Sequence, residues 1–300
     1  MNIGIDLGGS HIAVGIINEH GEILYKLEKD IAKENIEEIE EIIINLCKNC
    51  LEENNIDISK IQTIGMACPG EPENGCMKNV VNLGVKSYPI VENLQKKLGF
   101  RNISIRNDAK CAGIAEKKYG SLKDFDDCVF LCIGTGIGGA AFLNGKMLIP
   151  KKNSGFEFGH MIIEKNGKQC NCGNKGCFET YASMKCFKKE ILEYINEDNW
   201  SSREILNYLE KNINDKNLQI IIENYLDNLV LGLSNITNIL EPEVIALGGG
   251  FVYYKNILWE MLNNKYKNTE YVYNKEKRTK LTLARFGNDA GIIGASIDRM

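Results

Sequence analysis

No stretch of this 300-residue chain is apolar over the roughly 20 residues that a membrane-spanning helix needs. The first residues, MNIGIDLGGSH, also lack the charged and then apolar pattern of a secretory signal, because a strand pattern begins almost at once. We therefore expect a cytoplasmic protein without a membrane partner.

An excess of basic residues is also missing. Lys and Arg number 36 against 40 Asp and Glu, which gives a formal net charge of -4 at pH 7. Because proteins that bind nucleic acids usually present a basic face, this balance argues against a nucleic-acid partner. It leaves small anionic ligands open, since backbone N–H groups bind them without side-chain charge.

The eleven cysteines do not follow the pattern of a secreted disulfide protein, because their number is odd and they are scattered along a long chain. Most lie in apolar surroundings, where a thiol packs as a small hydrophobe. Cys47 and Cys50 stand three apart in a helical pattern with no second ligand pair nearby, so we interpret them as packing residues as well. The others that we expect to be buried are Cys68, Cys111, Cys128 and Cys132.

Two stretches of the chain share one pattern of strands and glycine turns. IDLGGSHIAVGIINEHGEIL and IGTGIGGAAFLNGKMLI both read as strand, glycine turn, strand, tight turn and strand, so they look like two copies of one motif. Helical periodicity follows each copy, at 33–54 and from the cysteine-rich segment to about residue 240. The sequence predicts two α/β lobes, and the cleft between lobes is the default ligand site. Further expected strands are 61–67, 103–105, 244–247 and 281–285, and further helices are 90–98, 108–119 and 290–297.

Gly134, Gly136 and Gly139 fit the G-x-G-x-x-G pattern, but a dinucleotide-binding fold requires a helix next. The chain continues as a strand and an Asn-Gly hairpin turn, so we exclude that fold. A Walker-type G-x-x-x-x-G-K-[ST] loop is absent from the sequence. What remains is one glycine turn between adjacent strands in each lobe.

Such turns leave backbone N–H groups bare and remove side chains that would block an anion. Two of them facing each other across a cleft would hold a triphosphate, and a third glycine loop would receive the base, sugar or α-phosphate of a nucleotide. A carboxylate beside the first turn would hold Mg²⁺ through water, because magnesium prefers one or two carboxylates plus phosphates. The alternative is that each loop is only a tight turn. The candidate residues are Asp6, Gly8, Gly9, Ser10, Gly134, Thr135, Gly136, Gly138, Gly248, Gly249 and Gly250.

Asn107 and Asp108 stand where a predicted strand ends and a helix begins. Asn and Asp fill N-cap positions very often, so one interpretation is structural. The other is a general base, because phosphoryl transfer to a hydroxyl needs a carboxylate near that hydroxyl. The sequence leaves both interpretations open.

The stretch HMIIEKNGKQCNCGNKGCFET concentrates thiols in a polar segment. Cys170, Cys172 and Cys177 are spaced C-x-C-x4-C, and three thiolates plus one imidazole make a closed tetrahedral zinc site. Of the three histidines in the chain, His160 is the natural fourth ligand. A closed site is structural and does not activate water. The alternative, free thiols in a loop, conflicts with the ease with which an exposed cluster oxidises.

Glu157 and Glu179 flank this segment. A metal would fix both carboxylates and one edge of the His160 imidazole, as outer-shell supports do. Carboxylates and imidazole accept hydrogen bonds from vicinal hydroxyl groups, which is how polyhydroxyl ligands are recognised.

The motifs GIDLGGS, CPG, NDA, GTGIGG, EFGH, CNCGNKGCFET, LGGG and GNDAGIIGA follow one another along nearly the whole chain. In these motifs the chain closely resembles a sugar kinase of the ROK family, within the actin/hexokinase/Hsp70-like superfamily. The resemblance implies an α/β, two-lobed, duplicated ribonuclease-H-like (actin-like ATPase) fold with an interlobe cleft. We expect the N-terminal lobe at 1–118, with the C-terminal helix 290–300 returning to it, and the C-terminal lobe with the zinc site at 119–289.

The resemblance further implies phosphoryl transfer from ATP, with Mg²⁺ and a structural Zn²⁺, to the 6-hydroxyl of a hexose, and a homodimer. It implies that Asp108 is the base and that His160 ligates zinc through one ring nitrogen while the other faces the sugar. The residues implied for sugar contact are Gly70, Asn107, Asp108, Glu157, His160 and Glu179.

Two residues depart from the family pattern. Ser10 replaces the usual threonine and keeps the hydroxyl, whereas Lys110 replaces the asparagine common two residues after the base, which bears on the preferred hexose. We expect glucokinase-like activity first, with N-acetylmannosamine kinase, allose kinase or fructokinase specificity as alternatives. A sugar-binding transcriptional regulator is less expected, because family members of that kind carry an added helix-turn-helix before the first strand. A sugar-binding protein without activity conflicts with the intact Asp108 and glycine loops.

Overall fold

A computed structural model describes residues 1–32, 34–80, 83–150, 155–269 and 279–298. The chain forms two compact units, each described here by itself. Unit 1 comprises Met1–Asp124, Gly145–Phe156 and Arg285–Met300, and unit 2 comprises Phe125–Asn144 and Glu157–Ala284. The lobe boundaries expected from the sequence stay a prediction. Lys33 and residues 299–300, which belong to expected helices, lie outside the described residues.

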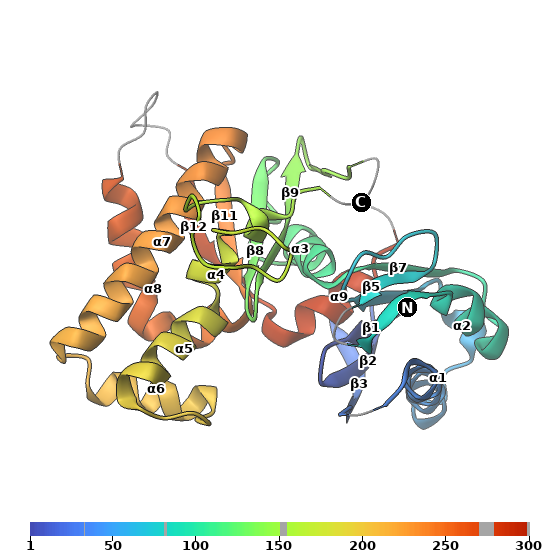
Figure 1. The fold of residues 1–300 in the computed structure, drawn as a ribbon. Helices are drawn as coiled ribbons and strands as arrows, with labels where there is room; N and C mark the ends of the chain where they lie inside the picture. Colours follow the sequence, from blue (N-terminus) through green and yellow to red (C-terminus); the bar gives the residue numbers. More distant parts are fainter. Residues whose placement is uncertain (33, 81–82, 151–154, 270–278, 299–300) are drawn as a thin grey trace. The chain divides into compact units, whose positions relative to one another are not determined.

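The first sheet has five strands in the order β3-β2-β1-β4-β7 (Figure 1). β1 (Asn2–Leu7), β2 (His11–Ile17) and β3 (Ile23–Asp30) form an antiparallel meander. β4 (Ile64–Cys68) and β7 (Ile103–Asn107) continue the sheet parallel to β1. β1, β2 and β4 are almost continuously buried, as expected for strands that are covered on both faces.

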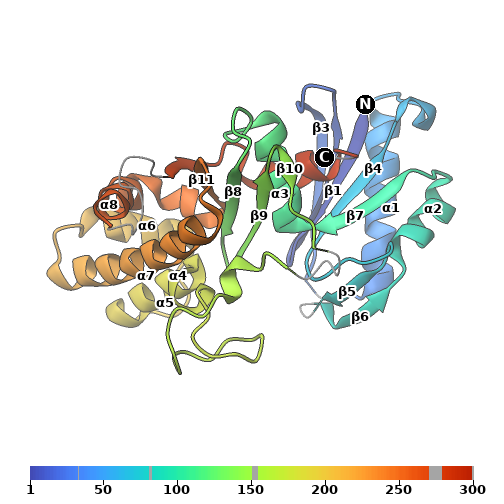
Figure 2. The same cartoon turned by 90° about the horizontal axis from the view of Figure 1, so that it is seen from above.

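Helices cover both faces of this sheet (Figure 2). α1 (Ile36–Glu53) and α2 (Ile90–Leu98) pack on one face, where strand isoleucines meet those of α1 in one buried cluster. α3 (Asp108–Tyr119) and α9 (Ala290–Ala295) pack on the other. A Cβ on Gly65 would lie 1.7 Å from an α9 carbonyl oxygen, so only glycine allows this approach.

A small ribbon of unit 1 was not predicted from the sequence. β5 (Met77–Val80) and β6 (Val85–Tyr88) pair antiparallel and form a separate two-stranded sheet. Each strand has only four residues, which is too short for an alternating pattern to stand out.

The second sheet repeats the order of the first, as β10-β9-β8-β11-β12. β8 (Cys128–Ile133) pairs antiparallel with β9 (Ile137–Leu143) and parallel with β11 (Val244–Gly248), which pairs parallel with β12 (Lys280–Leu283). β10 (Lys146–Met147) lies at the edge. The same strand order in both sheets confirms the predicted duplicated α/β fold.

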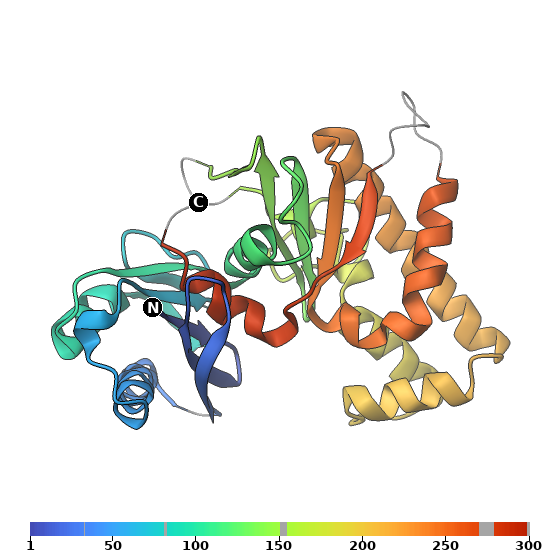
Figure 3. The ribbon, with the colours of Figure 1, turned by 180° about the vertical axis from the view of Figure 1, so that it is seen from behind.

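The helices of unit 2 follow the cysteine-rich segment and pack against one another. α7 and α8, drawn in orange and red-orange, run side by side in Figure 3. A capping box between Ser201 and Glu204 starts α6, and the Asp215 side chain accepts from two backbone N–H groups to start α7. The helices are α4 (Glu179–Ala182), α5 (Met184–Ile195), α6 (Ser202–Lys211), α7 (Lys216–Leu240) and α8 (Lys255–Asn268).

Between β11 and α8 the chain makes a 3₁₀ turn, Gly249–Tyr254, rather than entering the helix at once. Among the described residues, none of the helices has the length and apolar character required to span a membrane.

Candidate active site and metal centre

The cysteine-rich segment of unit 2 gathers four potential metal ligands. It connects a 3₁₀ turn, Phe158–His160, to α4. The ligand atoms of His160, Cys170, Cys172 and Cys177 all lie within 4.8 Å of one another. Cys172 Sγ lies 3.6 Å from Cys177 Sγ, and Cys170 Sγ lies 3.9 Å from His160 Nδ1. The structure therefore brings together all four residues that spacing selected.

Tight backbone turns produce this convergence. Gly173 N donates to Cys170 O at 3.1 Å, and Cys170 N donates to Asn174 O at 2.9 Å. Gly173 and Gly176 have φ angles of 93° and 81°, a region that side chains rarely adopt. A Cβ on Gly176 would also lie 1.8 Å from Glu164 O. Glycine is required at position 176 because the backbone there passes very close to the backbone of Glu164.

The donor set fits a closed zinc site, since three sulfurs and one imidazole nitrogen are soft ligands in tetrahedral number. Burial raises the pKa of Cys170 to about 12 and also raises the pKa of Cys177. The backbone N–H of Asn174 lowers the pKa of the exposed Cys172. Without a cation the two buried thiols stay protonated at neutral pH, so metal binding would have to displace their protons.

Glu179 connects this cluster with the glycine turn between β8 and β9. Its Oε1 lies 3.2 Å from Cys170 Sγ and 3.8 Å from His160 Nδ1. Its Oε2 accepts from Ile137 N at 3.3 Å. A Cβ on Gly136 would lie 2.5 Å from that same oxygen. The sequence analysis missed this connection, although a glycine at position 136 is the signal for a close approach there.

The two glycine loops of unit 2 lie at the carboxyl ends of the parallel strands β8 and β11. In the first, Gly134 N bonds Gly136 O at 2.9 Å, and a Cβ on Gly134 would meet nothing within 4 Å. In the second, Gly249 has φ 68°, and a Cβ there would lie 2.8 Å from Ile133 O. The carboxyl ends of parallel strands are the usual ligand side of such sheets. Of the other candidates, Gly138 lies in β9 and pairs with Cys132 of β8. Gly250 packs on the Met184 side chain.

A cavity of about 430 Å³ opens beside the first of these loops. Lys185 N donates to Gly134 O at 3.2 Å, which ties the start of α5 to the loop. The volume is within the range of small-molecule sites. Lining residues include Thr135, Lys168, Glu179, Ser183, Lys185 and Glu190.

Unit 1 brings two carboxylates together near its own glycine turn. Gly8 N bonds His11 O at 2.9 Å in this turn, and both Gly9 and Ser10 are exposed. At the end of β1, burial and, to a smaller extent, the Asp108 carboxylate raise the pKa of Asp6 to about 7. A Cβ on Gly291 would lie 2.3 Å from Asp6 Oδ2, so α9 covers this carboxylate closely.

The structure separates the two interpretations of the residues at the start of α3. Asn107 is the N-cap, because its Oδ1 accepts from Lys110 N at 3.2 Å. Its Nδ2 donates to Gly70 O at 3.2 Å. Asp108 is therefore the first helical residue, and its Oδ1 accepts from Ala109 N at 2.7 Å. Part of the Asp108 side chain is exposed to water. The surrounding protein nevertheless removes much of the water from its carboxyl group, and this desolvation raises the pKa of Asp108.

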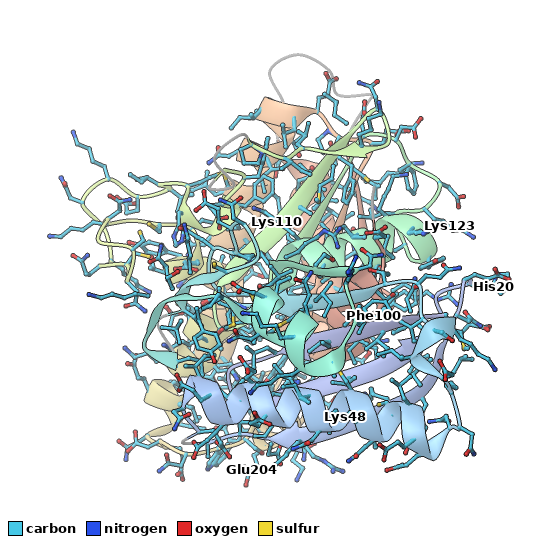
Figure 4. All side chains as sticks on the ribbon, turned by 90° about the vertical axis from the view of Figure 1, so that its right-hand side faces the viewer. His20, Lys48, Phe100, Lys110, Lys123 and Glu204 are labelled. Carbon is cyan, nitrogen blue, oxygen red and sulfur yellow. The ribbon has the colours of Figure 1, made fainter. Side chains whose placement is uncertain are left out.

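The remaining predicted sugar contacts lie in both units. In unit 1, Gly70 has φ 82°, and a Cβ there would lie 2.5 Å from Lys78 O of β5. Lys110 lies in the first turn of α3 (Figure 4). In unit 2, Glu157 and His160 are exposed and belong to the same turn, where His160 N donates to Glu157 O at 3.0 Å. Unit 1 thus groups Gly70, Asn107 and Asp108, and unit 2 groups Glu157, His160 and Glu179.

The chain is similar to bacterial proteins named as sugar kinases over nearly its whole length. It is 29% identical to a glucokinase of Thermotoga maritima, covering 98% of this chain and 95% of that protein. It is 28% identical to an N-acetyl-D-glucosamine kinase of Vibrio cholerae, with 99% and 98% covered. The crystal structure of a ROK family glucokinase from Streptomyces griseus with glucose and AMPPNP has a TM-score of 0.83 at 20% identity, over 98% and 97% of the two chains. That likeness supports the actin-like ATPase fold expected from the sequence. The model of the ROK family matches residues 2–297, and the chain belongs to that family.

Proposed function

We propose that this protein is an ATP-dependent kinase that phosphorylates the 6-hydroxyl of a hexose or an N-acetylhexosamine. The observation that carries the proposal is the division of roles at the start of α3. Asn107 caps the helix, so the Asp108 carboxylate stays open to a ligand. Membership of the ROK family and the similarity to a glucokinase and an N-acetyl-D-glucosamine kinase support a sugar as the acceptor.

In the proposed reaction, Asp108 accepts the proton of the sugar hydroxyl. The hydroxyl oxygen forms a bond to the γ-phosphorus of ATP, the bond from that phosphorus to the β–γ bridging oxygen breaks, and ADP leaves. A carboxylate whose pKa is raised by desolvation is a stronger base than an ordinary aspartate. The sugar is held by Gly70, Asn107, Glu157, His160 and Glu179, whose acceptors suit vicinal hydroxyl groups.

We assign the triphosphate to the bare backbone N–H groups of residues 8–10 and 134–136, and the rest of the nucleotide to the loop at 248–250. The open space at Gly134 and the adjoining cavity of about 430 Å³ support this assignment in unit 2. Asp6 would hold Mg²⁺ through water, and the cation would neutralise charge on the phosphates. A pKa of about 7 for Asp6 fits this role, because a nearby cation stabilises the ionised form.

We assign a structural Zn²⁺ to His160, Cys170, Cys172 and Cys177. In this role the metal supplies no chemistry to the reaction and fixes the loop that carries the sugar contacts. The contact of Glu179 Oε1 with Cys170 supports the idea, since a fixed cluster would orient that carboxylate. Cytoplasmic location remains an expectation from the sequence, and a homodimer remains an expectation from the family resemblance.

A coupled assay of ADP release tests the function. The protein, loaded with zinc, is supplied with MgATP and with glucose, mannose, fructose, allose, N-acetylglucosamine or N-acetylmannosamine in turn. We expect ADP release that depends on at least one of these sugars, with glucose or an N-acetylhexosamine giving the highest kcat/KM. Sugar binding by calorimetry without any sugar-dependent ADP release would identify a binding protein and contradict the proposal.

A further inference from the structure

A buried carboxylate outside the proposed active site holds two distant segments of unit 1 together. Glu116, near the end of α3, is 0% exposed. Its Oε2 accepts from Ser121 N and from Ser121 Oγ, both at 2.8 Å. Its Oε1 accepts from Arg285 N at 2.7 Å and from Phe286 N at 2.9 Å. Four donors therefore bond to this one buried side chain.

The two segments are those by which the chain first leaves unit 1 and last returns to it. The first part of unit 1 ends at Asp124, three residues after Ser121, and Lys123 of this segment is labelled in Figure 4. The last part begins at Arg285, which is itself one of the donors. Glu116 thus bonds the exit segment with one oxygen and the return segment with the other.

The local structure makes room for this contact. A Cβ on Gly120 would lie 2.2 Å from Glu116 Oε2, so glycine after the helix allows the chain to fold back over the carboxylate. Both oxygens are also occupied by short hydrogen bonds, which in a buried environment are strong and directional. A side chain held in this way has little freedom to move without breaking bonds to both segments.

Glu116 is linked through secondary-structure elements to Asp108 and Asp6, the two carboxylates of the proposed reaction. Asp108 opens the same helix two turns earlier. The return segment leads from Phe286 into α9, where Gly291 packs against the Asp6 carboxylate. A shift of the Glu116 side chain would therefore change the positions of both α3 and α9. Glu116 is not among the residues assigned to sugar or nucleotide.

We infer that Glu116 is the shared anchor of the exit and return segments and acts as a positioning residue for phosphoryl transfer. It sets the orientation of α3 and α9 where the chain passes between the units. The kinetic part of this inference rests on the proposed function, whereas the anchor itself does not.

Amide hydrogen exchange tests the anchor directly. In Glu116→Gln, one acceptor oxygen becomes an NH₂ group, so one pair of donors loses its partner. We expect exchange at Ser121, Arg285 and Phe286 to rise by about tenfold or more, since local opening sets the protection of these amides. Glu19→Gln, an exposed carboxylate of the same unit, is the control and should leave all three unchanged.

Ser121→Ala provides a milder variant in case Glu116→Gln does not fold, and Ser87→Ala, at an exposed serine of β6, is its control. It removes only the hydroxyl bond on the exit side. A shared anchor predicts faster exchange at Arg285 and Phe286 as well, on the return side. An effect confined to the neighbourhood of residue 121 would overturn the shared anchor.

Steady-state kinetics test the positioning role at a temperature at which the variant is fully folded. We expect kcat of Glu116→Gln to fall by about tenfold or more while the sugar KM changes by less than about threefold, because misplacement of a catalytic group lowers kcat rather than binding. A kcat within about twofold of the wild-type value would overturn that role. A wild-type protein without kinase activity would refute the proposed function instead, and the exchange experiment would still decide on the anchor.

Discussion

Asp6 is an acid whose surroundings oppose its charge. Burial raises its pKa to about 7, against an ordinary value near 3.8, and the Asp108 carboxylate adds to the effect. Between these two pH values the unfolded chain releases the proton while the folded protein keeps it. Stability from this residue is therefore lost as pH rises from about 4 to about 7, and the loss is complete above that window.

Asp6→Asn should for this reason stabilise the protein. We expect the free energy of unfolding at pH 8 to rise by about 1–2 kcal/mol without added magnesium, and the gain to vanish below about pH 4. Urea denaturation at both pH values measures it. Asp57→Asn is a control for which we expect the opposite result, a lower free energy of unfolding. A hydrogen bond with Ser59 lowers the pKa of Asp57, so the charged form of Asp57 stabilises the fold. An Asp6→Asn protein no more stable than wild type at pH 8 would contradict the burial argument.

The residues of the candidate site were predicted from the sequence, whereas the local contacts of several of them could not be. The sequence did not decide whether Asp108 caps the helix or acts as a base, because capping depends on which side chain reaches the backbone N–H groups. The structure gives that contact to Asn107. The bonds of Glu116 and Glu179 were not predicted, since their partners Arg285 and Ile137 are far away in the chain.

The elements were predicted best where the periodic pattern is long or the start signal is strong. α2 and α3 begin and end at the expected residues, 90–98 and 108–119. The 3₁₀ turn Gly249–Tyr254 was not predicted from the sequence, and it begins at Gly249, which has a positive φ. The cysteine-rich loop has no periodic pattern, and only ligand spacing indicated that it closes on itself.

The cysteine-rich loop should contain about one zinc ion per chain, because its four donors make a closed set. We expect Cys177→Ser to lose the metal and to show faster amide exchange over residues 160–178. Cys186→Ser, a thiol of the same unit outside the cluster, should keep its zinc. Elemental analysis of the purified proteins measures the stoichiometry, and a wild-type protein without zinc would refute the metal assignment.

Gly136→Ala should disturb the proposed sugar site through Glu179. A Cβ at this position would lie 2.5 Å from Glu179 Oε2, and the flexible carboxylate would yield at small cost in stability. Loss of one charged hydrogen bond to the sugar corresponds to an increase of about 10- to 100-fold in sugar Kd. Gly134→Ala, where a Cβ meets nothing within 4 Å, should leave sugar Kd unchanged. Equal sugar affinities for the two variants, measured by calorimetry, would exclude this role of Glu179.

The whole chain consists of two copies of one sheet pattern that carry different chemistry. The first copy ends its strands at Asp6 and the Asn107–Gly70 contact, whereas the second ends at glycine loops and the cysteine-rich insertion. The repeat was visible in the sequence because each copy keeps the same order of strands and turns. Equivalent strand ends of the two copies therefore carry different side chains, and the proposed function assigns the base to unit 1 and the zinc ligands to unit 2.

The central claim is that Asp108 accepts the proton of the sugar hydroxyl during phosphoryl transfer, and the Asp108→Asn protein tests it most directly. Asparagine keeps the shape of the side chain and removes the base. With the sugar that the wild-type protein prefers, we expect kcat to fall by about 10²–10⁴-fold, as for loss of a general base, while calorimetry finds sugar Kd within about threefold of the wild-type value. An Asp108→Asn protein that keeps most of its turnover would contradict the account.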